Sequence, residues 1–445
     1  AMNKFIISLV ISSLMACSVN AQETDLKTTL EATYANNPLI AQQREMILKL
    51  NESVVQQSSL IMPGISATLS QNLDDNNGNY ANSANITIKQ LIYDGGQSLN
   101  LIDASKYAVF AERELLIKAE QDNLLKAITS YMDFRQAKAN LDLAESNIKV
   151  IKEQLRASKN RFEVGEVTRT DVSQTEARLA LALSNVEARR ASLSSKSASY
   201  LLVVGEYPGK LANPPKHPDV PIELHIAEKI ALENHPRIRA AKLNLKSSEH
   251  KINASRKIGS PTISGSLTTK TGSSIRSSTG ATIQATIPLF SGGELRSKRR
   301  AAINDKQIRK YALDNAILMT RSNLQIYHSS WLAAVAAIKA SNAQIKSSKI
   351  AFEGVREEAK LGSRTTLDVL DAEQELLSAR SNLVSALRDE QVQAYNVISE
   401  MGQLTASNLN LDIKAYDPEI DYNNVIKKSP LGEARIKILE KLQNK

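Results

Sequence analysis

The chain has 445 residues, a formal net charge of +9 at pH 7, 4% aromatic residues, 17 glycines and 12 prolines. This composition favours long helices over a bulky globular core. The basic residues lie along the predicted helices beside Glu and Asp and are not interleaved with aromatic residues. They therefore indicate solvated helix surfaces, and we expect no nucleic-acid partner.

The first 21 residues have the pattern of an export signal. Lys4 supplies the positive charge, residues 5–15 supply the apolar stretch, and Val19-Asn20-Ala21 supplies a small-residue cleavage site. We therefore expect a signal peptide at 1–21 and a mature chain that begins near Gln22. Beyond this segment, no stretch approaches the roughly 18 apolar residues of a membrane-spanning helix.

Cys17 is the only cysteine of the chain, so no disulfide can form within it. It either leaves with the signal peptide or is the lipidated residue of a lipoprotein box at 14–17. Met15 fits such a box poorly, and a conventional cleavage site follows it. Removal with the signal peptide is the preferred interpretation.

The most informative feature of the sequence is an internal duplication. Asn36-Asn37-Pro38 recurs as Asn234-His235-Pro236, and Val164-Gly165 recurs as Leu361-Gly362. Every recurring landmark keeps an offset of 197 or 198 residues, which indicates two copies of one unit. The other pairs are 63–66 with 261–264, 94–96 with 291–293, 171–172 with 368–369, and 204–205 with 401–402.

The duplication predicts the organisation of the whole chain. We expect each unit to run helix, β-hairpin, long helix, tip turn, helix. The predicted parts are a first repeat unit at 22–205, a Pro-rich equatorial linker at 206–221, a second repeat unit at 222–402, and an equatorial segment with a C-terminal tail at 403–445.

Apolar and small residues recur along the helices at heptad-like spacing, which predicts closely packed coiled-coil seams. In the first unit we expect a long helix from about Gln97 to Glu163, roughly 100 Å at 1.5 Å per residue. The flanking helices, about 24–60 and 169–204, are each near half that length. Two short helices stacked end to end would match the long one, so the predicted shape is a rod. A generic coiled coil is the alternative.

Between the first and second helix of each unit, the sequence pattern changes to a period of two. Residues 65–70 and 281–287 alternate apolar with polar positions, and Ile86, Ile88 and Ile92 mark a less regular strand. Strands of about 9–12 residues are long enough to cross a bilayer when tilted, with lipid on one face and water on the other. A soluble sandwich strand shows the same alternation. The hairpin loops are expected at 74–82 and 271–278.

Four such strands per chain cannot close a membrane barrel, and an open strand edge in lipid leaves backbone groups without partners. If these strands lie in a membrane, the chain must therefore oligomerise. A dimer would supply eight strands and a trimer twelve.

In order and at doubled spacing, these features resemble the TolC family of outer-membrane efflux and secretion ducts over about residues 24–412. The resemblance implies an α+β membrane protein in the outer membrane of a Gram-negative bacterium. Three protomers with four strands each would form a twelve-stranded transmembrane β-barrel, continued into the periplasm by a long coiled-coil α-barrel. The motifs that carry the resemblance are 36–39, the strand exits at 93–96 and 290–293, and the tips at 161–172 and 361–372.

As function, the resemblance implies the exit duct of a tripartite export machine. Its partners would be a periplasmic adaptor (membrane fusion protein), an inner-membrane ABC exporter or proton-driven pump, and outer-membrane lipid. Type I protein secretion is preferred because the chain looks non-lipidated and residues 408–418 are similar to secretion-type members. Multidrug efflux is the alternative. A periplasmic coiled-coil adaptor, which would lack the duplicated amphipathic strands, is a distant one.

No enzyme chemistry or cofactor is expected. The five histidines make no metal-ligand spacing, and no nucleophile motif or phosphate loop occurs. The histidines are His217, His225, His235, His250 and His328.

The resemblance further implies that the tips form a closable aperture at the inner end of the duct. Asp368 and Asp371 would point into this aperture as carboxylate rings, at which cations would block conduction. The first unit has Gln174 at the position of Asp371, so that ring belongs to the second unit alone. No structural metal is expected.

A latch would hold this aperture shut, with Arg364 bridging to Thr170 and Asp171 on the other tip. The family has a tyrosine where this chain has Ala359, so one latch contact is missing here. The tip turns, which would also contact the adaptor, comprise Val164, Gly165, Glu166 and Val167 in the first unit and Leu361, Gly362 and Ser363 in the second.

The local chemistry of the tips favours sharp, capped turns. Glycine at 165 and 362 permits a backbone conformation that strains other residues. Thr168 or Thr170, and Thr365 or Thr366, are expected to cap the return helices, with Asp171 and Asp368 at the positive helix ends. Ordinary helix-hairpin turns would have the same features.

Overall fold

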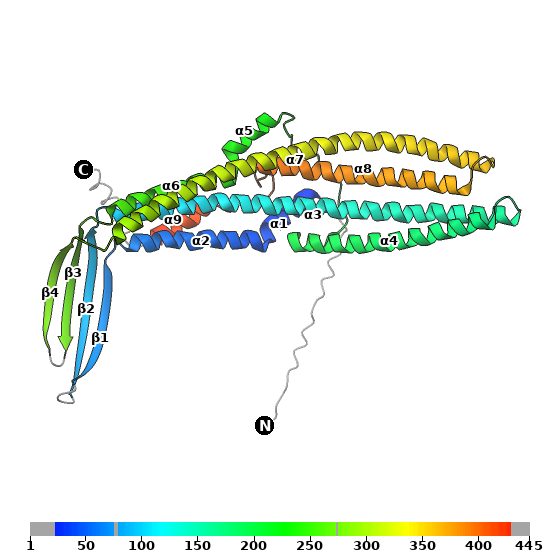
Figure 1. Ribbon diagram of the computed structural model, residues 1–445. Helices are drawn as coiled ribbons and strands as arrows, with labels where there is room; N and C mark the ends of the chain where they lie inside the picture. The colour runs from blue at the N-terminus through cyan, green and yellow to red at the C-terminus, as the bar shows by residue number, and fades with distance from the viewer. Residues whose placement is uncertain (1–22, 75–78, 273–274, 429–445) are drawn as a thin grey trace, which may run out of the picture.

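The computed structural model describes residues 23–74, 79–272 and 275–428. The expected signal peptide, Cys17 and the tail beyond Lys428 lie outside these residues. The chain forms a helical rod with a four-stranded sheet at one end and two helical hairpin tips at the other (Figure 1). Within the described part of the chain, no helix has both the length and the hydrophobicity that a membrane span requires.

The second half of the chain repeats the elements of the first. Both long helices, α3 and α7, have 67 residues, and α3 has the bounds expected from the sequence. The first half comprises α1 (Leu26–Asn36), α2 (Pro38–Ser59), β1 (Gly64–Asp74), β2 (Asn79–Tyr93), α3 (Gln97–Glu163) and α4 (Arg169–Val204). The second comprises α5 (Leu224–Asn234), α6 (Pro236–Lys257), β3 (Thr262–Gly272), β4 (Ile275–Thr286), α7 (Glu294–Lys360) and α8 (Thr366–Glu400), followed by α9 (Pro418–Lys428).

The expected single helix over 24–60 is wrong, because the chain breaks at Pro38 into α1 and α2. Proline has no backbone N–H and is tolerated at the first position of a helix. The side chain of Asn37 accepts a hydrogen bond from the N–H of Leu39 at 2.9 Å. In the second unit, Nδ1 of His235 accepts from the N–H of Arg237 at 3.2 Å. The repeated Asn/His-Pro motif is therefore a helix start within each unit.

In the first unit, α2 and α4 lie end to end alongside α3, and α1 lies beside their junction (Figure 1). The side-chain amide of Asn37 donates to the carbonyl of Val203 at 3.0 Å, and Thr29 and Tyr200 share a hydroxyl hydrogen bond at 2.9 Å. The end-to-end arrangement expected from the helix lengths is confirmed.

The largest apolar core lies at mid-length, where α1, α3, α4, α5, α7 and α8 meet. Its fully buried aromatic residues include Tyr131 and Tyr200. Val220 of the linker and Leu404 after α8 are buried in the same core. The Tyr131 hydroxyl donates to the carbonyl of Ala212 at 2.8 Å. The Pro-rich linker and the segment after α8 are thus attached to the middle of the rod, while α9 lies along α2 nearer the sheet (Figure 1).

The sheet has the order β1-β2-β3-β4, and all its pairs are antiparallel. Its register places Ile65, Ile88, Leu267 and Ala281 in one row across the four strands. The adjacent row on the opposite face is Ser66, Thr87, Thr268 and Gly280. One face is therefore apolar and the other hydroxyl-rich, as the alternation predicts.

The strands extend further than the sequence suggested. Pairing continues to Asp74 with Asn79 in the first hairpin and to Gly272 with Ile275 in the second. The loops expected at 74–82 and 271–278 are therefore too long, because polar residues near the hairpin ends still form ladder hydrogen bonds. A register shift between Leu91 and Tyr93 explains the irregular alternation of β2.

Candidate functional site

The candidate site is the pair of hairpin tips at the end of the rod opposite the sheet. The tip of the first hairpin joins α3 to α4, and the tip of the second joins α7 to α8. Gly165 has φ +81° and Gly362 has φ +82°, a left-handed conformation that favours glycine. Both glycines thus play the turning role expected of them.

Each return helix begins with the same capping box. Thr168 and Asp171 exchange side-chain and backbone hydrogen bonds at the start of α4, and Thr365 and Asp368 do so at the start of α8. Of the two threonines considered at each tip, Thr168 and Thr365 are the caps. The boxes satisfy N–H groups that a helix start leaves without partners, so both return helices begin with a defined cap.

Asp368, one of the two predicted ring residues, is occupied by this cap. Its Oδ2 atom accepts from the N–H and from the hydroxyl of Thr365, each at 2.9 Å. These bonds lower the pKa of Asp368, so the carboxylate stays charged at neutral pH. Among the described residues, its second oxygen makes no hydrogen bond.

Asp371, the other predicted ring residue, pairs with the first hairpin. Nη2 of Arg178 on α4 lies 2.8 Å from Oδ1 of Asp371 on α8. The two residues are 193 positions apart in the sequence. This pair joins the two tips directly.

Arg364 contacts its own tip, with Nε 2.9 Å from Oε2 of Glu358. Between the described residues of one chain, the expected bridge from Arg364 to Thr170 and Asp171 is therefore not formed. Bridging between neighbouring chains stays a prediction. A different residue, Arg161, reaches across within the chain and donates to the carbonyl oxygen of Ala359 at 3.3 Å.

Both turns present an apolar side chain to solvent. Val164 is 72% exposed and Leu361 is 85% exposed, and the two positions are related by the repeat. Single exposed apolar side chains are common on protein surfaces, so a role of these two residues in contacting a partner stays a prediction.

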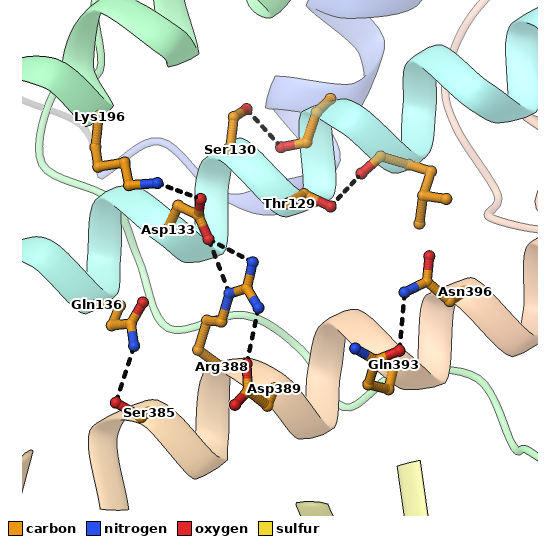
Figure 2. A network of polar contacts seen from close by, with 12 residues as sticks. Thr129, Ser130, Asp133, Gln136, Lys196, Ser385, Arg388, Asp389, Gln393 and Asn396 are labelled. Atoms are coloured by element: carbon orange, nitrogen blue, oxygen red, sulfur yellow. Dashed lines mark hydrogen bonds and ion pairs between the residues drawn. The ribbon is translucent and has the colours of Figure 1, made fainter. Parts of the chain in front are cut away.

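Above the tips, α3 and α8 meet in a polar seam that includes Gln136 with Ser385 and Asn140 with Ser381, each pair hydrogen-bonded at 3.0 Å. Figure 2 shows the upper end of this seam, where Asp133 lies between Lys196 of α4 and Arg388 of α8. Each step of three or four residues along α3 is matched by an equal step back along α8. One chain thus joins its two hairpins through polar contacts over several helical turns.

Nearer the tips, the seam becomes apolar. Ile151 of α3, Ala182 of α4 and Leu370 of α8 form a buried cluster. Glu373 lies one turn beyond Leu370 on the same helix and is only 7% exposed. One of its carboxylate oxygens has no hydrogen-bond partner among the described residues. Burial raises the pKa of Glu373 to about 7.

Sequence reasoning missed Arg178, Arg161 and Glu373. A signal for the two arginines is present in the duplication, because the counterparts of Arg161 and Arg178 at the repeat offset are Glu358 and Glu375. Such a charge inversion between equivalent positions indicates tips that complement each other. No group of His, Cys, Asp and Glu side chains within the described part of the chain is arranged to hold a metal ion.

A duplicated helical rod, with amphipathic strands at one end and capped tips at the other, defines a duct protein of the outer membrane. The family model for "Outer membrane efflux protein" matches residues 29–205 and 229–402, so the chain belongs to this family. Its members are channel-forming proteins and not enzymes. The chain is accordingly an outer-membrane channel of the TolC type that extends into the periplasm of a Gram-negative bacterium.

Individual relatives agree with this assignment. The chain is 33% identical to the outer membrane efflux protein BepC of Brucella suis over 350 residues, which cover 76% of each protein. It is 26% identical to the alkaline protease secretion protein AprF of Pseudomonas aeruginosa, over 60% of this chain and 59% of AprF. The Campylobacter jejuni CmeC outer membrane channel has the same fold, with a TM-score of 0.77 at 16% identity over 91% of this chain and 89% of CmeC.

Proposed function

We propose that three copies of this chain form the exit duct of a type I protein secretion machine. The observation that carries the proposal is the four-stranded sheet, which has an apolar face and ends in two edge strands, β1 and β4. In lipid, each edge needs a partner strand. Three sheets joined edge to edge give twelve strands, enough for a closed barrel with a water-filled interior.

The polar face of the sheet supports a water-filled passage through such a barrel. Rows that include Thr68, Asn85 and Lys270 would line the lumen, while the row of Ile65, Ile88 and Leu267 would contact outer-membrane lipid. The helical rod would extend this passage into the periplasm.

At the inner end, the tips would form the aperture and contact the partners. Exposed Val164 and Leu361 would meet a periplasmic adaptor, which connects the duct to an inner-membrane ABC exporter or proton-driven pump. Asp368 and Asp371 would face the narrowest part, where three copies of each approach one axis. Carboxylates held close together repel one another and favour a bridging multivalent cation.

Secretion is preferred over drug efflux because AprF is named for alkaline protease secretion and because residues 408–418 are similar to secretion-type members. Multidrug efflux is the second candidate, since the name of BepC, which has 33% identity, describes an efflux protein. The lumen is the same in both cases, so the inner-membrane partner would decide between them.

Assembly is tested by cross-linking the purified mature protein in mild detergent. Products that stop at three subunits, and a trimer that dissociates on heating, support the proposal. A stable monomer or dimer would contradict it, because four or eight strands would then have to suffice.

Transport is tested in the native host by deleting the gene. Loss of a large secreted polypeptide from the medium, with unchanged drug susceptibility, supports secretion. Increased drug susceptibility with normal secretion would instead support efflux.

A further inference from the structure

We infer that Arg178 is a positioning residue of the aperture: it holds the second hairpin tip against the first and compensates the charge of Asp371. The inference rests on the proposed role of the tips as the inner end of a duct. It adds a contact within one chain, in a protein where the latch tyrosine expected by the family pattern is replaced by Ala359.

The position of the pair is fixed by its neighbours in the chain. Leu179 follows Arg178, and Leu370 precedes Asp371. Both leucines pack in the apolar cluster that joins α3, α4 and α8. The ion pair thus lies at the exposed margin of a packed contact between the hairpins. Such packing fixes the backbone on both sides of the pair, so the two side chains, 2.8 Å apart, start from positions that the fold sets.

A second arginine makes an independent connection on the other helix pair. Nε of Arg161 lies 3.0 Å from Oε2 of Glu166, which orients the guanidinium. Its Nη1 then donates to the carbonyl of Ala359 near the end of α7. Both connections therefore run from basic side chains of the first tip to acceptors of the second.

The second tip is more acidic than the first, as expected if basic side chains of the first tip bind acceptors of the second. Residues 153–178 contain five basic and five acidic side chains, a net charge of 0. The equivalent residues 350–375 contain three basic and seven acidic side chains, a net charge of −4. At the positions related by the repeat, the second unit has Glu375 where the first has Arg178, and the first unit has Gln174 where the second has Asp371. The repeat therefore does not supply a second, equivalent ion pair between the hairpins.

The pair also changes the charge that the aperture presents. Asp368 keeps a charged carboxylate whose partner is its own helix cap, whereas the charge of Asp371 is compensated by Arg178. With the hairpins together, each protomer contributes one ring carboxylate, Asp368, that forms no ion pair with the other hairpin among the described residues, although Arg364 of its own tip helps to lower its pKa. Separation of the hairpins would expose the second. The distance between the tips and the affinity of the aperture for cations are therefore coupled.

The test compares Arg178→Gln with Arg190→Gln in planar bilayers. Arg190 lies on the same helix and pairs with Glu145 and Glu187, both on its own hairpin. The two variants remove the same charge, but only Arg178→Gln breaks a link between hairpins. We expect Arg178→Gln to raise the open probability about twofold to fivefold, in keeping with a partly exposed ion pair. It should also lower the blocking concentration of a trivalent cation such as hexamminecobalt by a similar factor.

Substitution of Asp371 distinguishes the effect of losing the contact between hairpins from the effect of changing the charge of the aperture. Asp371→Asn should raise the open probability like Arg178→Gln but should weaken cation block. The double exchange Arg178→Asp with Asp371→Arg should restore the open probability of the wild type. If Arg178→Gln and Arg190→Gln both form channels and have the same open probability and the same cation block as each other, the inference is overturned. The proposed function as a duct would be unaffected by that result. A wild-type protein that forms no channel would overturn the proposed function as well.

Discussion

Nε2 of His217 lies 2.6 Å from Oε1 of Glu390, and Nδ1 of the same ring lies 2.7 Å from the carbonyl oxygen of Pro218. Both partners are hydrogen-bond acceptors, so both ring nitrogens must carry a proton and His217 is an imidazolium ion. The ring is buried, and Trp331 donates to the same oxygen of Glu390 at 3.4 Å. This cluster attaches the Pro-rich linker to α7 and α8.

We predict that this attachment depends on pH. The hydrogen bond to Glu390 raises the pKa of His217 despite its burial. Burial alone would raise the pKa of Glu390, but His217, Trp331 and Gln391 together lower it. The pair therefore stabilises the fold fully between the unfolded pKa values of Glu and His, about 4.3 and 6.5. This stability is lost as pH rises through the folded pKa of His217, and also as pH falls through that of Glu390.

His217→Gln should thus lower the thermal unfolding midpoint in detergent most near pH 5.5, by an amount corresponding to about 1.5–3 kcal/mol. The difference from the wild type should shrink toward pH 9. His225→Gln is the matched control, because His225 is exposed beside Glu223. A constant difference across this range would show that His217 acts through packing alone.

The second prediction concerns Glu373, whose pKa of about 7 lies above the ordinary value of 4.5. Between these values the folded state holds a proton that the unfolded state releases, so stability falls as pH rises from 4.5 through 7. Glu373→Gln should remove this dependence and should be more stable than the wild type at pH 8, by up to roughly 3 kcal/mol. Thermal unfolding of the wild type and of Glu373→Gln, monitored by circular dichroism at several pH values, measures this difference in stability.

Exposed Glu375 on the same helix provides the control, since Glu375→Gln should leave the pH dependence unchanged. Parallel pH profiles for wild type and Glu373→Gln would mean that the buried carboxylate has found a partner in the assembled protein.

The third prediction concerns Gly402, just after α8. It has φ +74°, and a Cβ atom there would lie 2.6 Å from the carbonyl oxygen of Asn234 at the end of α5. Gly402→Ala should cost at least about 1–2 kcal/mol from the left-handed conformation alone. The contact with rigid backbone should add to this cost.

Gly354→Ala makes the same chemical change within α7, where nothing lies within 4 Å of the added carbon. It should stabilise the protein by about 0.5–1 kcal/mol, because alanine favours the helix. Unfolding midpoints that shift in the same direction for both variants would refute this account of Gly402.

The fourth prediction concerns Asp133, which lies 2.8 Å from Nζ of Lys196 and 2.7 Å from Nη2 of Arg388 (Figure 2). Asp133→Asn keeps the size of the side chain but removes the charge that joins three helices. We expect a loss of about 1–3 kcal/mol, because hydrogen bonds to charged groups are the stronger ones.

Asp142→Asn affects an exposed pair with Lys138 on the same helix and should cost no more than about 0.5 kcal/mol. Limited proteolysis of the linker and tips, together with thermal unfolding, compares the two variants. Equal losses would mean that Asp133 contributes no more than a surface charge.

Local and periodic features of this fold could be predicted from the sequence. The bounds of α3, the glycine turns at 165 and 362, and the alternation of the strands each depend on short-range chemistry. The break at Pro38 is also encoded locally, by the Asn-Pro cap, although one helix over about 24–60 was expected. The helix α9 was not predicted, because its 11 residues depend on packing against α2.

Contacts between distant segments could not be predicted in the same way. Arg178 reaches Asp371 only because α4 and α8 come together at one end of the rod, and no local pattern specifies that meeting. The same holds for His217 and Glu390. The repeat offset indicates which positions are equivalent between the units, but a charge inversion such as Arg161 and Glu358 becomes informative only once the tips are known to be neighbours.

The two edge strands of the sheet have a consequence for biogenesis. A single chain that entered the outer membrane would place the free backbone groups of β1 and β4 in hydrocarbon, where each unsatisfied group costs several kcal/mol. The same chain left in water would expose Ile65, Leu69 and Ile283 on its apolar face. The monomer is therefore unstable both in the outer membrane and in water. Insertion and association must be completed together, and the yield of finished ducts should fall steeply when the newly exported chain is scarce.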